Sequence, residues 1–268
     1  MDTHPDTASL GLLEDALRKT MLSTSGAELD AALVELGWGD MLTDMPELAV
    51  PLVFRLLGET GSHASVLNDV VQQTADRELG ATPELPFAGG GWVVWDRSAT
   101  APEHPALGGL PLRRVDDGGL LRLADARRAL GWWLVGTARA MLTLACQHAL
   151  DRVQFGRPIA SFQAVRHRLA ETLVAIEGAE ATLSLPGADN FDLTALLAKA
   201  AAGKAALTAA KNCQQVIAGI GFTEEHDLHL HVKRALVLDG LLGSSRELTK
   251  KAGAGLRARG SVPRLAQL

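Results

Sequence analysis

The spacing of apolar residues along the chain predicts a mainly helical protein. Leu10, Leu13, Leu17 and Met21 recur every three or four residues, which is the period of one face of an α-helix. Comparable patterns predict further helices over about 25–36, 46–57 and 63–74. Residues 1–76 are therefore expected to form an N-terminal helical region.

Residues 77–118 differ, because prolines and glycines interrupt every run that would be long enough for a helix. The stretch GWVVWD, at 91–96, is a short β-like run bounded by turn residues, and LPLRRVDD, at 110–117, is a second candidate strand. We expect a shortened, β-containing middle segment rather than a full sheet domain.

Helical periodicity returns over residues 119–268, in much longer stretches. An apolar stripe predicts a helix over about 121–153, which Gly156-Arg157-Pro158 ends, and Ser161 is a candidate cap for the next helix. An alanine-rich helix is expected over about 191–217, and a last helix from 224 or 227 towards 256. Long antiparallel helices with short connections predict a four-helix bundle.

Composition and charge limit the function classes. Hydrophobic residues are 47% and charged residues 21% of the chain, as in ordinary globular proteins, and the net charge of −5 gives no reason to expect binding to nucleic acid or a membrane surface. The longest apolar run, at 129–144, is broken by Arg139 and is too short to span a bilayer. The first residues lack a signal-peptide pattern, so a cytoplasmic protein is expected, with Cys146 and Cys213 as buried, reduced thiols.

Two stretches combine the residue types that bind a phosphorylated ligand. DRVQFGRPIASFQAVRHRLAE, at 151–171, places arginines and glutamines at a helix–turn–helix corner, and QQVIAGIGFTEEHDLHLHVKRA, at 214–235, contains a glycine-rich helix end. Arginine offers a rigid fork to phosphate oxygens, and glycine lets a ligand approach the backbone closely. For the first stretch alone, a solvated basic corner is the alternative interpretation.

Together, in this order, the two stretches resemble the C-terminal helical domain of the acyl-CoA dehydrogenases over residues 121–256, with weaker similarity in the N-terminal helices. The resemblance implies oxidation of the Cα–Cβ bond of an acyl-CoA thioester, in which a glutamate removes the α proton and FAD accepts the β hydride. It also implies that the C-terminal domain of one subunit helps to hold the pyrophosphate and adenine of its neighbour's FAD.

The resemblance assigns a set of residues to this cofactor. Arg152 matches an arginine that binds the pyrophosphate, Gln154 lies beside it, and Phe155 packs against the cofactor. Ala218 departs from the first glycine of the turn that meets the adenosine end, a change small enough to keep the site. The residues implied to bind FAD are Arg152, Gln154, Phe155, Gln163, Gln215 and Gly219.

The two positions where the family carries its catalytic glutamate hold Ala126 and Gly243, so neither has a carboxylate. The nearby Asp125 and Asp239 would point about 100° away on their helices, and we expect them to be solvated surface acids. The Thr/Ser-rich strand segment that contacts the flavin ring in the family is also missing from 77–118. The chain thus keeps the motifs for the adenosine half of FAD and lacks those for its reactive half.

This combination resembles the degenerate subunit of heteromeric acyl-CoA dehydrogenases of actinobacteria, which act on bulky thioesters including steroid side chains. The resemblance implies a heterotetramer in which a full-length partner supplies the base and most of the acyl-CoA site, while this chain alone is inactive. Two alternatives stay open: a self-sufficient homomeric dehydrogenase with a non-standard base, and a flavin-free structural partner.

Three histidines, His226, His229 and His231, suggest a metal site only superficially. On a helix the first two share a face, but His231 does not lie well with both. The family that the chain resembles has no metal there, so none is expected.

Overall fold

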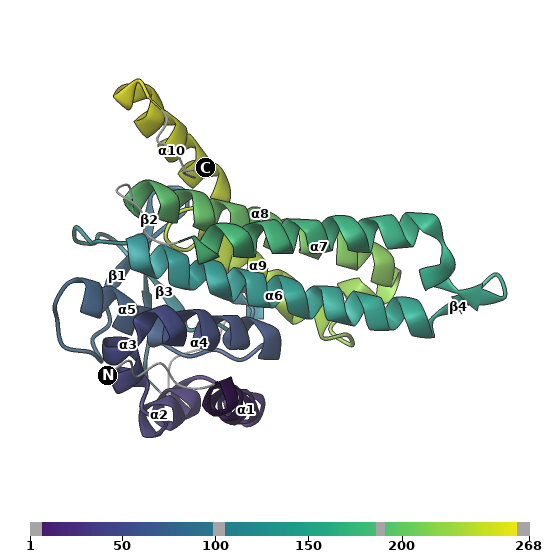
Figure 1. Cartoon of the computed structure of the whole chain (residues 1–268), viewed down its shortest axis with the longest axis horizontal. Helices are drawn as coiled ribbons and strands as arrows, with labels where there is room; N and C mark the ends of the chain where they lie inside the picture. The colour runs from purple at the N-terminus through teal and green to yellow at the C-terminus, as the bar shows by residue number, and fades with distance from the viewer. Residues whose placement is uncertain (1–6, 99–104, 186–190, 262–268) are drawn as a thin grey trace.

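The computed structural model describes residues 7–98, 105–185 and 191–261 and has the expected mainly α fold, with a small β segment and a C-terminal helical bundle (Figure 1). Its elements, in chain order, are α1 (Thr7–Ser23), α2 (Ala27–Glu35), α3 (Trp38–Asp44), α4 (Pro46–Thr60), α5 (Val66–Thr74), β1 (Glu84–Phe87), β2 (Gly91–Trp95), η1 (Pro105–Leu107), β3 (Leu112–Val115), α6 (Ala124–Asp151), β4 (Val153–Gln154), β5 (Arg157–Pro158), η2 (Ile159–Ser161), α7 (Gln163–Ser184), α8 (Phe191–Ile217), η3 (Ala218–Phe222), α9 (Leu228–Gly240) and α10 (Ser245–Arg259).

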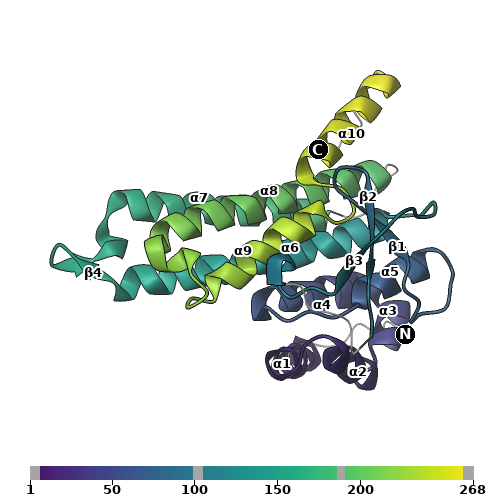
Figure 2. The same ribbon diagram turned by 180° about the vertical axis from the view of Figure 1, so that it is seen from behind.

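Helix α6 lies at the centre of the molecule and packs against α4, α7, α8 and α9 (Figures 1 and 2). Its sequence explains this position, because Leu130, Trp133 and Met141 are fully buried in the main core. Helix α8 presents small side chains to the bundle at Ala198, Ala202, Ala205 and Ala209. All four are buried, which lets neighbouring helices approach closely.

The N-terminal helices join the bundle through a contact between α4 and α6 that leaves no room for side chains. A Cβ atom at Gly58 would lie 2.4 Å from the carbonyl oxygen of Trp133, and one at Gly136 would lie 2.0 Å from that of Arg55. Real Cβ atoms do not approach backbone this closely, so both positions require glycine. The two helices therefore cross backbone to backbone.

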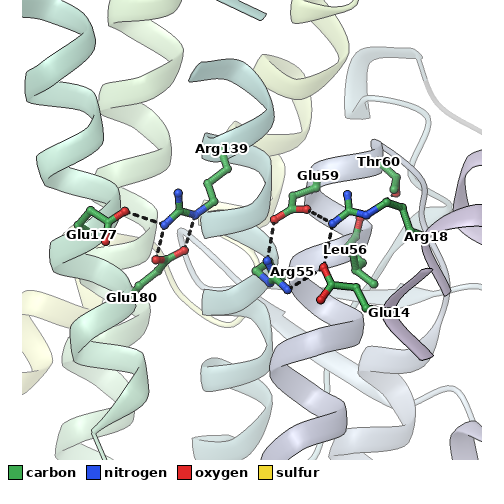
Figure 3. Close-up of polar contacts among 9 residues, drawn as sticks. All are labelled: Glu14, Arg18, Arg55, Leu56, Glu59, Thr60, Arg139, Glu177 and Glu180. Carbon is green, nitrogen blue, oxygen red and sulfur yellow. Dashed lines mark hydrogen bonds and ion pairs between the residues drawn. The ribbon is translucent and has the colours of Figure 1, made fainter. Parts of the chain in front are cut away.

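Ion pairs link the helices on either side of this crossing (Figure 3). Arg18 of α1 contacts both Glu14 and Glu59, at 3.0 and 2.8 Å, and Arg55 of α4 contacts the same two carboxylates, at 3.2 and 3.3 Å. The four residues thus form a closed ring between α1 and α4. Arg139 of α6 pairs with Glu177 and Glu180 of α7 in the same way, so α6 is tied by charge to its bundle neighbour.

The β segment is a three-stranded antiparallel sheet with the order β1-β2-β3. Trp92 of β2 pairs with Val115 of β3, and Pro86 of β1 pairs with Trp92 on the other side. The two stretches expected to be strands are β2 and β3, so that prediction is confirmed. The sheet also contacts the C-terminal half, because the amide of Leu242 donates to the carbonyl of Pro86 at 2.8 Å.

Three local predictions were wrong. Helix α3 was not expected, and it begins at Trp38, whose side chain is buried and donates to Asp69 at 3.1 Å. The last helix is two helices, because the chain breaks between α9 and α10 at residues 241–244. Ser161 does not cap α7: Phe162 is the N-cap residue, and the Ser161 hydroxyl donates to the carbonyl of Pro158.

Of the two thiols, Cys213 is buried as expected, but Cys146 is only half-buried, and both are free. Burial raises the pKa of Cys213 to about 12 and that of Cys146 in the same direction. Both thiols therefore stay protonated and unreactive at neutral pH.

Two helical segments, α6 and residues 192–222, have the length and apolar composition of a membrane span. In each, 67% of the apolar window is buried inside the protein. That burial is what the central helices of a bundle require, so the apolar character of both segments is explained by packing.

Candidate cofactor site

The arginine motif forms a small hairpin that projects from the far end of the bundle (Figures 1 and 2). Strands β4 and β5 pair Gln154 with Arg157, and the amide of Ile159 donates to the carbonyl of Arg152 at 2.8 Å. The hairpin thus connects the end of α6 to the start of α7. Its residues Asp151 to Pro158 are all exposed.

The turn of this hairpin holds an aromatic side chain in an unfavourable position. Phe155 and Gly156 form the two-residue loop, with φ of 53° and 74°, and Phe155 is 92% exposed. Left-handed backbone costs a non-glycine residue roughly 1 kcal/mol or more. Phe155 packs edge-on against Phe162, with ring centroids 6.0 Å apart, and Arg157 lies 4.4 Å over the Phe162 ring. The fold maintains an exposed aromatic and cationic tip at some energetic cost.

The second motif ends α8 at the same end of the bundle. Ala218 begins η3 in left-handed backbone, with φ of 60°, a conformation that favours the glycine which the resemblance implies at this position. A Cβ atom at Gly219 would meet nothing within 4 Å, so the backbone there is open to a ligand. The ring centroids of His226, just before α9, and His148 of α6 are 6.4 Å apart, so the start of α9 lies beside the end of α6.

The polar side chains of both motifs face outward. Arg152, Gln154, Gln163 and Gln215 are all exposed, and the one side-chain hydrogen bond that Gln154 donates within the described residues goes to the carbonyl of its neighbour Val153. Within the described ranges Arg152 makes no ion pair, in contrast to Arg139 and Arg18. The donor set of one guanidinium, three amides and open backbone fits a pyrophosphate linked to adenosine. On one chain, this set forms a surface rather than an enclosed pocket.

Two cavities lie away from this tip. One, of about 580 Å³, separates the α1–α2 connection from the α4–α5 connection and includes Ser25 and His63, which are hydrogen-bonded at 2.9 Å. The other, of about 510 Å³, lies beside α6 and includes Arg18, Arg139 and His231. In the described part of the chain neither cavity is lined by a residue that the resemblance assigned to FAD.

The histidines of the second motif are separated by the fold. His231 is buried beside Gly61 of the N-terminal region, whereas His226 and His229 are half-buried. Among residues 7–98, 105–185 and 191–261, no cluster of three or more metal-ligating side chains is present.

The two positions at which the resemblance places a catalytic glutamate lie in different surroundings. Ala126 is fully buried in α6, and Gly243 lies in the α9–α10 loop with φ of 98°. Asp125 is exposed as a residue, but partial burial of its carboxyl group raises its pKa, although it accepts a hydrogen bond from Thr74 at 3.3 Å. Asp239 was expected to be solvated, and that was wrong: it is buried and accepts the amide of Ser245 at 3.1 Å. Its carboxylate therefore holds the start of α10.

A buried lysine that the sequence did not suggest holds the same loop. Lys199 of α8 is 0% exposed and donates to the carbonyl oxygens of Asp239 and Gly243, each at 2.5 Å. Arg127 of α6 donates to the carbonyl oxygen of Leu242, the residue before Gly243, at 3.2 Å. From the sequence alone, a lysine in the alanine-rich stretch of α8 is expected to be solvent-exposed, so its burial could be seen only in the structure. The loop is fixed by side chains from two bundle helices.

Lys199 is expected to make the protein more stable at mildly alkaline pH. Burial, reinforced by Arg127, lowers the pKa of Lys199 to about 7, while its unfolded value is near 10.5. Between these values the unfolded chain binds more protons, so stability rises with pH by up to about 1.4 kcal/mol per pH unit. Urea unfolding at pH 7, 8 and 9 should show this rise in the wild type and not in Lys199→Met. Parallel curves for the two proteins would contradict it.

Sequence comparison connects the chain to known proteins. The family described as "Acyl-CoA dehydrogenase, C-terminal domain" matches residues 120–251. Acyl-CoA dehydrogenase IpdE2 of Mycobacterium tuberculosis is 33% identical over 257 residues, which are 86% of this chain and 79% of that protein. Acyl-CoA dehydrogenase FadE34 of the same organism is 41% identical over 135 residues, but these are 46% of this chain and only 19% of FadE34.

Solved structures share the fold at low identity. The ChsE4-ChsE5 complex of Mycobacterium tuberculosis contains a chain with a TM-score of 0.68 and 18% identity, covering 98% of this chain and 100% of that one. A variant of the Tcur3481-Tcur3483 steroid ACAD has a TM-score of 0.70 at 20% identity, covering 94% and 98%. The similarity to IpdE2 over most of both sequences, together with the two motifs at the end of the bundle, establishes that this chain belongs to the acyl-CoA dehydrogenase family.

Proposed function

We propose that this chain is the non-catalytic subunit of a heteromeric, FAD-dependent acyl-CoA dehydrogenase. Members of the family use FAD. The residues that the resemblance assigns to the pyrophosphate and adenosine of FAD lie in this chain at the exposed hairpin and at the neighbouring end of α8. The observation that carries the proposal is their combination with Ala126 and Gly243 at the two base positions. A subunit that binds one end of the cofactor and supplies no base needs a second, full-length subunit.

In this proposal the tip residues bind and orient the cofactor at the subunit interface. The Arg152 guanidinium neutralises the pyrophosphate, Gln154 and Gln163 donate amide hydrogens, and Phe155 covers an apolar part of the cofactor. Gln215 and the open backbone at Gly219 meet the adenosine end. Bound FAD would supply the hydride acceptor for the acyl chain, and the base that takes the proton would belong to the partner.

The partner would also bind most of the acyl-CoA. The solved structures with this fold include the ChsE4-ChsE5 complex and a steroid ACAD, which supports a heteromeric complex that acts on a bulky, steroid-like CoA thioester. We propose that this complex is a heterotetramer in the cytoplasm. Neither of the two cavities described above is lined, among the described residues, by Arg152, Gln154 or Phe155, which is consistent with an acyl site formed mainly by the other subunit.

Removing the Arg152 side chain is expected to weaken FAD binding in the co-expressed complex about ten- to a hundredfold. A charge-assisted contact of this kind contributes about 1.5–3 kcal/mol. Flavin content and FAD titration of the complex containing Arg152→Ala would measure the loss. Arg77→Ala, an equal change at another exposed arginine, is the matched control and should leave flavin content unchanged.

Activity measurements separate this proposal from its alternatives. The chain purified alone should not turn over acyl-CoA thioesters, whereas a complex with a full-length dehydrogenase should. Turnover by the isolated chain that disappears in Asp125→Asn would identify a homomeric enzyme with a non-standard base. A complex whose flavin content ignores Arg152→Ala would instead favour a structural partner without a role in flavin binding.

A further inference from the structure

Helix α10 projects from the body of the molecule, on the opposite side from α1 and α2 (Figures 1 and 2). Of its 15 residues only Leu248 and Ala252 are buried, and they pack on Leu196 and Ala200 of α8 in a cluster separate from the main core. From residue 253 to 259 only Leu256 is half-buried, and the rest are exposed. The distal half of α10 is therefore an arm that little of the described chain supports.

The base of the arm is fixed all the same. Ser244 and Glu247 form a capping box, in which each side chain bonds to the other residue's backbone amide. Glu247 also accepts the amide of Gly89 in the β1–β2 turn at 2.9 Å, and Lys199 holds the preceding loop. The direction of α10 is thus set by contacts at its first turn.

The exposed side of α10 carries a stripe of positive charge. Arg246, Lys250 and Arg257 are spaced by four and seven residues, so they lie on one face, about opposite Leu248 and Ala252. With Lys251 and Arg259, the helix has five basic residues and one acidic residue, a net charge of +4 in a chain whose total is −5. Gly253 falls within the stripe and leaves room for a close neighbour.

An acidic surface, of opposite charge to the arm, lies on the other side of the molecule, on α2 and α3. Residues 25–54 contain six acidic residues and no lysine or arginine. Glu28 and Glu35 are seven residues apart on one face of α2, and Asp40 and Asp44 are four apart on α3. All four side chains are exposed. We define Glu28, Glu35, Asp40 and Asp44 as the acidic face.

We propose that the basic arm of one copy of this chain docks onto the acidic face of a second copy. The two surfaces cannot meet within one molecule, because α10 and α2 lie on opposite sides in both views (Figures 1 and 2). Each copy offers one arm and one face, so a reciprocal exchange closes a dimer and a one-way contact extends a chain of copies. This contact is independent of the flavin site, since it uses none of its residues.

Exposed ion pairs are individually weak and screened by salt, so the contact depends on several pairs acting together. Sedimentation velocity of the full chain in 50 mM NaCl should show concentration-dependent association. Raising NaCl to 500 mM should increase the apparent dissociation constant by about tenfold or more. Lys250→Glu with Arg257→Glu should abolish association, as should Glu28→Lys with Glu35→Lys. The matched control, Lys204→Glu with Lys211→Glu on α8, should not.

Mixing the two reversed proteins gives the decisive result. The arm-reversed protein keeps its acidic face and the face-reversed protein keeps its basic arm, so the mixture should associate although neither protein does so alone. The proposal is overturned if the wild type is monomeric at low salt, if the reversed proteins associate like the wild type, or if their mixture stays monomeric. Association that requires the full-length dehydrogenase would assign the arm to that partner and also overturn the proposal.

Discussion

Gly136→Ala is expected to destabilise the protein by about 3 kcal/mol or more, although it adds a single methyl group. That methyl would lie 2.0 Å from the carbonyl oxygen of Arg55 and 3.1 Å from its Cα, and the three nearest atoms all belong to the backbone. Backbone cannot rotate away as a side chain can, so α4 and α6 must separate, and the core around Trp133 opens with them. Thermal and urea unfolding of the isolated chain would measure the loss.

Gly178→Ala provides the matched control. Gly178 is also inside a long helix, α7, but a Cβ atom there would meet nothing within 4 Å. The same substitution should therefore stabilise the protein by about 0.5–1 kcal/mol, because alanine favours helix over the unfolded chain. Equal effects at the two glycines would show that helix propensity, and not the close crossing of α4 and α6, determines the result.

The helical pattern made most of this fold predictable. The long helices α6, α7 and α8 have apolar stripes that persist over several turns, so their period is unmistakable, and the two β-like stretches are indeed strands. The break after α9 could not be read, because Leu241 and Leu242 continue the apolar run across it. Leu242 is buried there in left-handed backbone, with φ of 59°, which only tertiary contacts impose.

The local geometry of the candidate site was also predictable in part. Its motif residues are adjacent in sequence, so a single corner places Arg152, Gln154 and Phe155 together on one exposed hairpin. The surroundings of Gly243, one of the two expected base positions, were not predictable, because Lys199 and Gly243 are 44 residues apart and meet only through the packing of α8 on α9. Local sequence specifies surfaces well and specifies buried polar contacts poorly.

Acidification below pH 6.5 is expected to remove several kcal/mol of stability through two buried histidines. Burial, with the nearby charge of Arg234, lowers the pKa of both His63 and His231 to about 4, whereas an unfolded histidine titrates near 6.5. Above pH 6.5 both states are neutral. Between pH 6.5 and 4 the unfolded chain takes up protons that the folded chain excludes. The free energy of unfolding therefore decreases as the pH is lowered, by up to about 1.4 kcal/mol per pH unit for each histidine.

The contacts explain why the folded protein resists these protons. His63 Nδ1 lies 2.9 Å from the Ser25 hydroxyl and 3.3 Å from a guanidinium nitrogen of Arg234. Arg234 is itself held by the carbonyl oxygens of Gly108 and Ser62, so it cannot withdraw. A proton on Nδ1 would remove the acceptor and face a fixed positive charge. Against a total stability of roughly 5–15 kcal/mol, losing both histidine contributions should unfold the protein near pH 4–5.

Two substitutions separate this effect from general acid unfolding. His63→Asn keeps an acceptor oxygen near the position of Nδ1, and His231→Phe replaces a ring whose buried Nδ1 has no hydrogen-bond partner in the described residues. Each should flatten the dependence of unfolding free energy on pH between 6.5 and 4 and lower the acid midpoint. Tryptophan fluorescence in urea at each pH measures both quantities. Replacing the exposed His167 with Asn should change neither, and a wild-type slope that survives in His63→Asn with His231→Phe would assign acid unfolding to other groups.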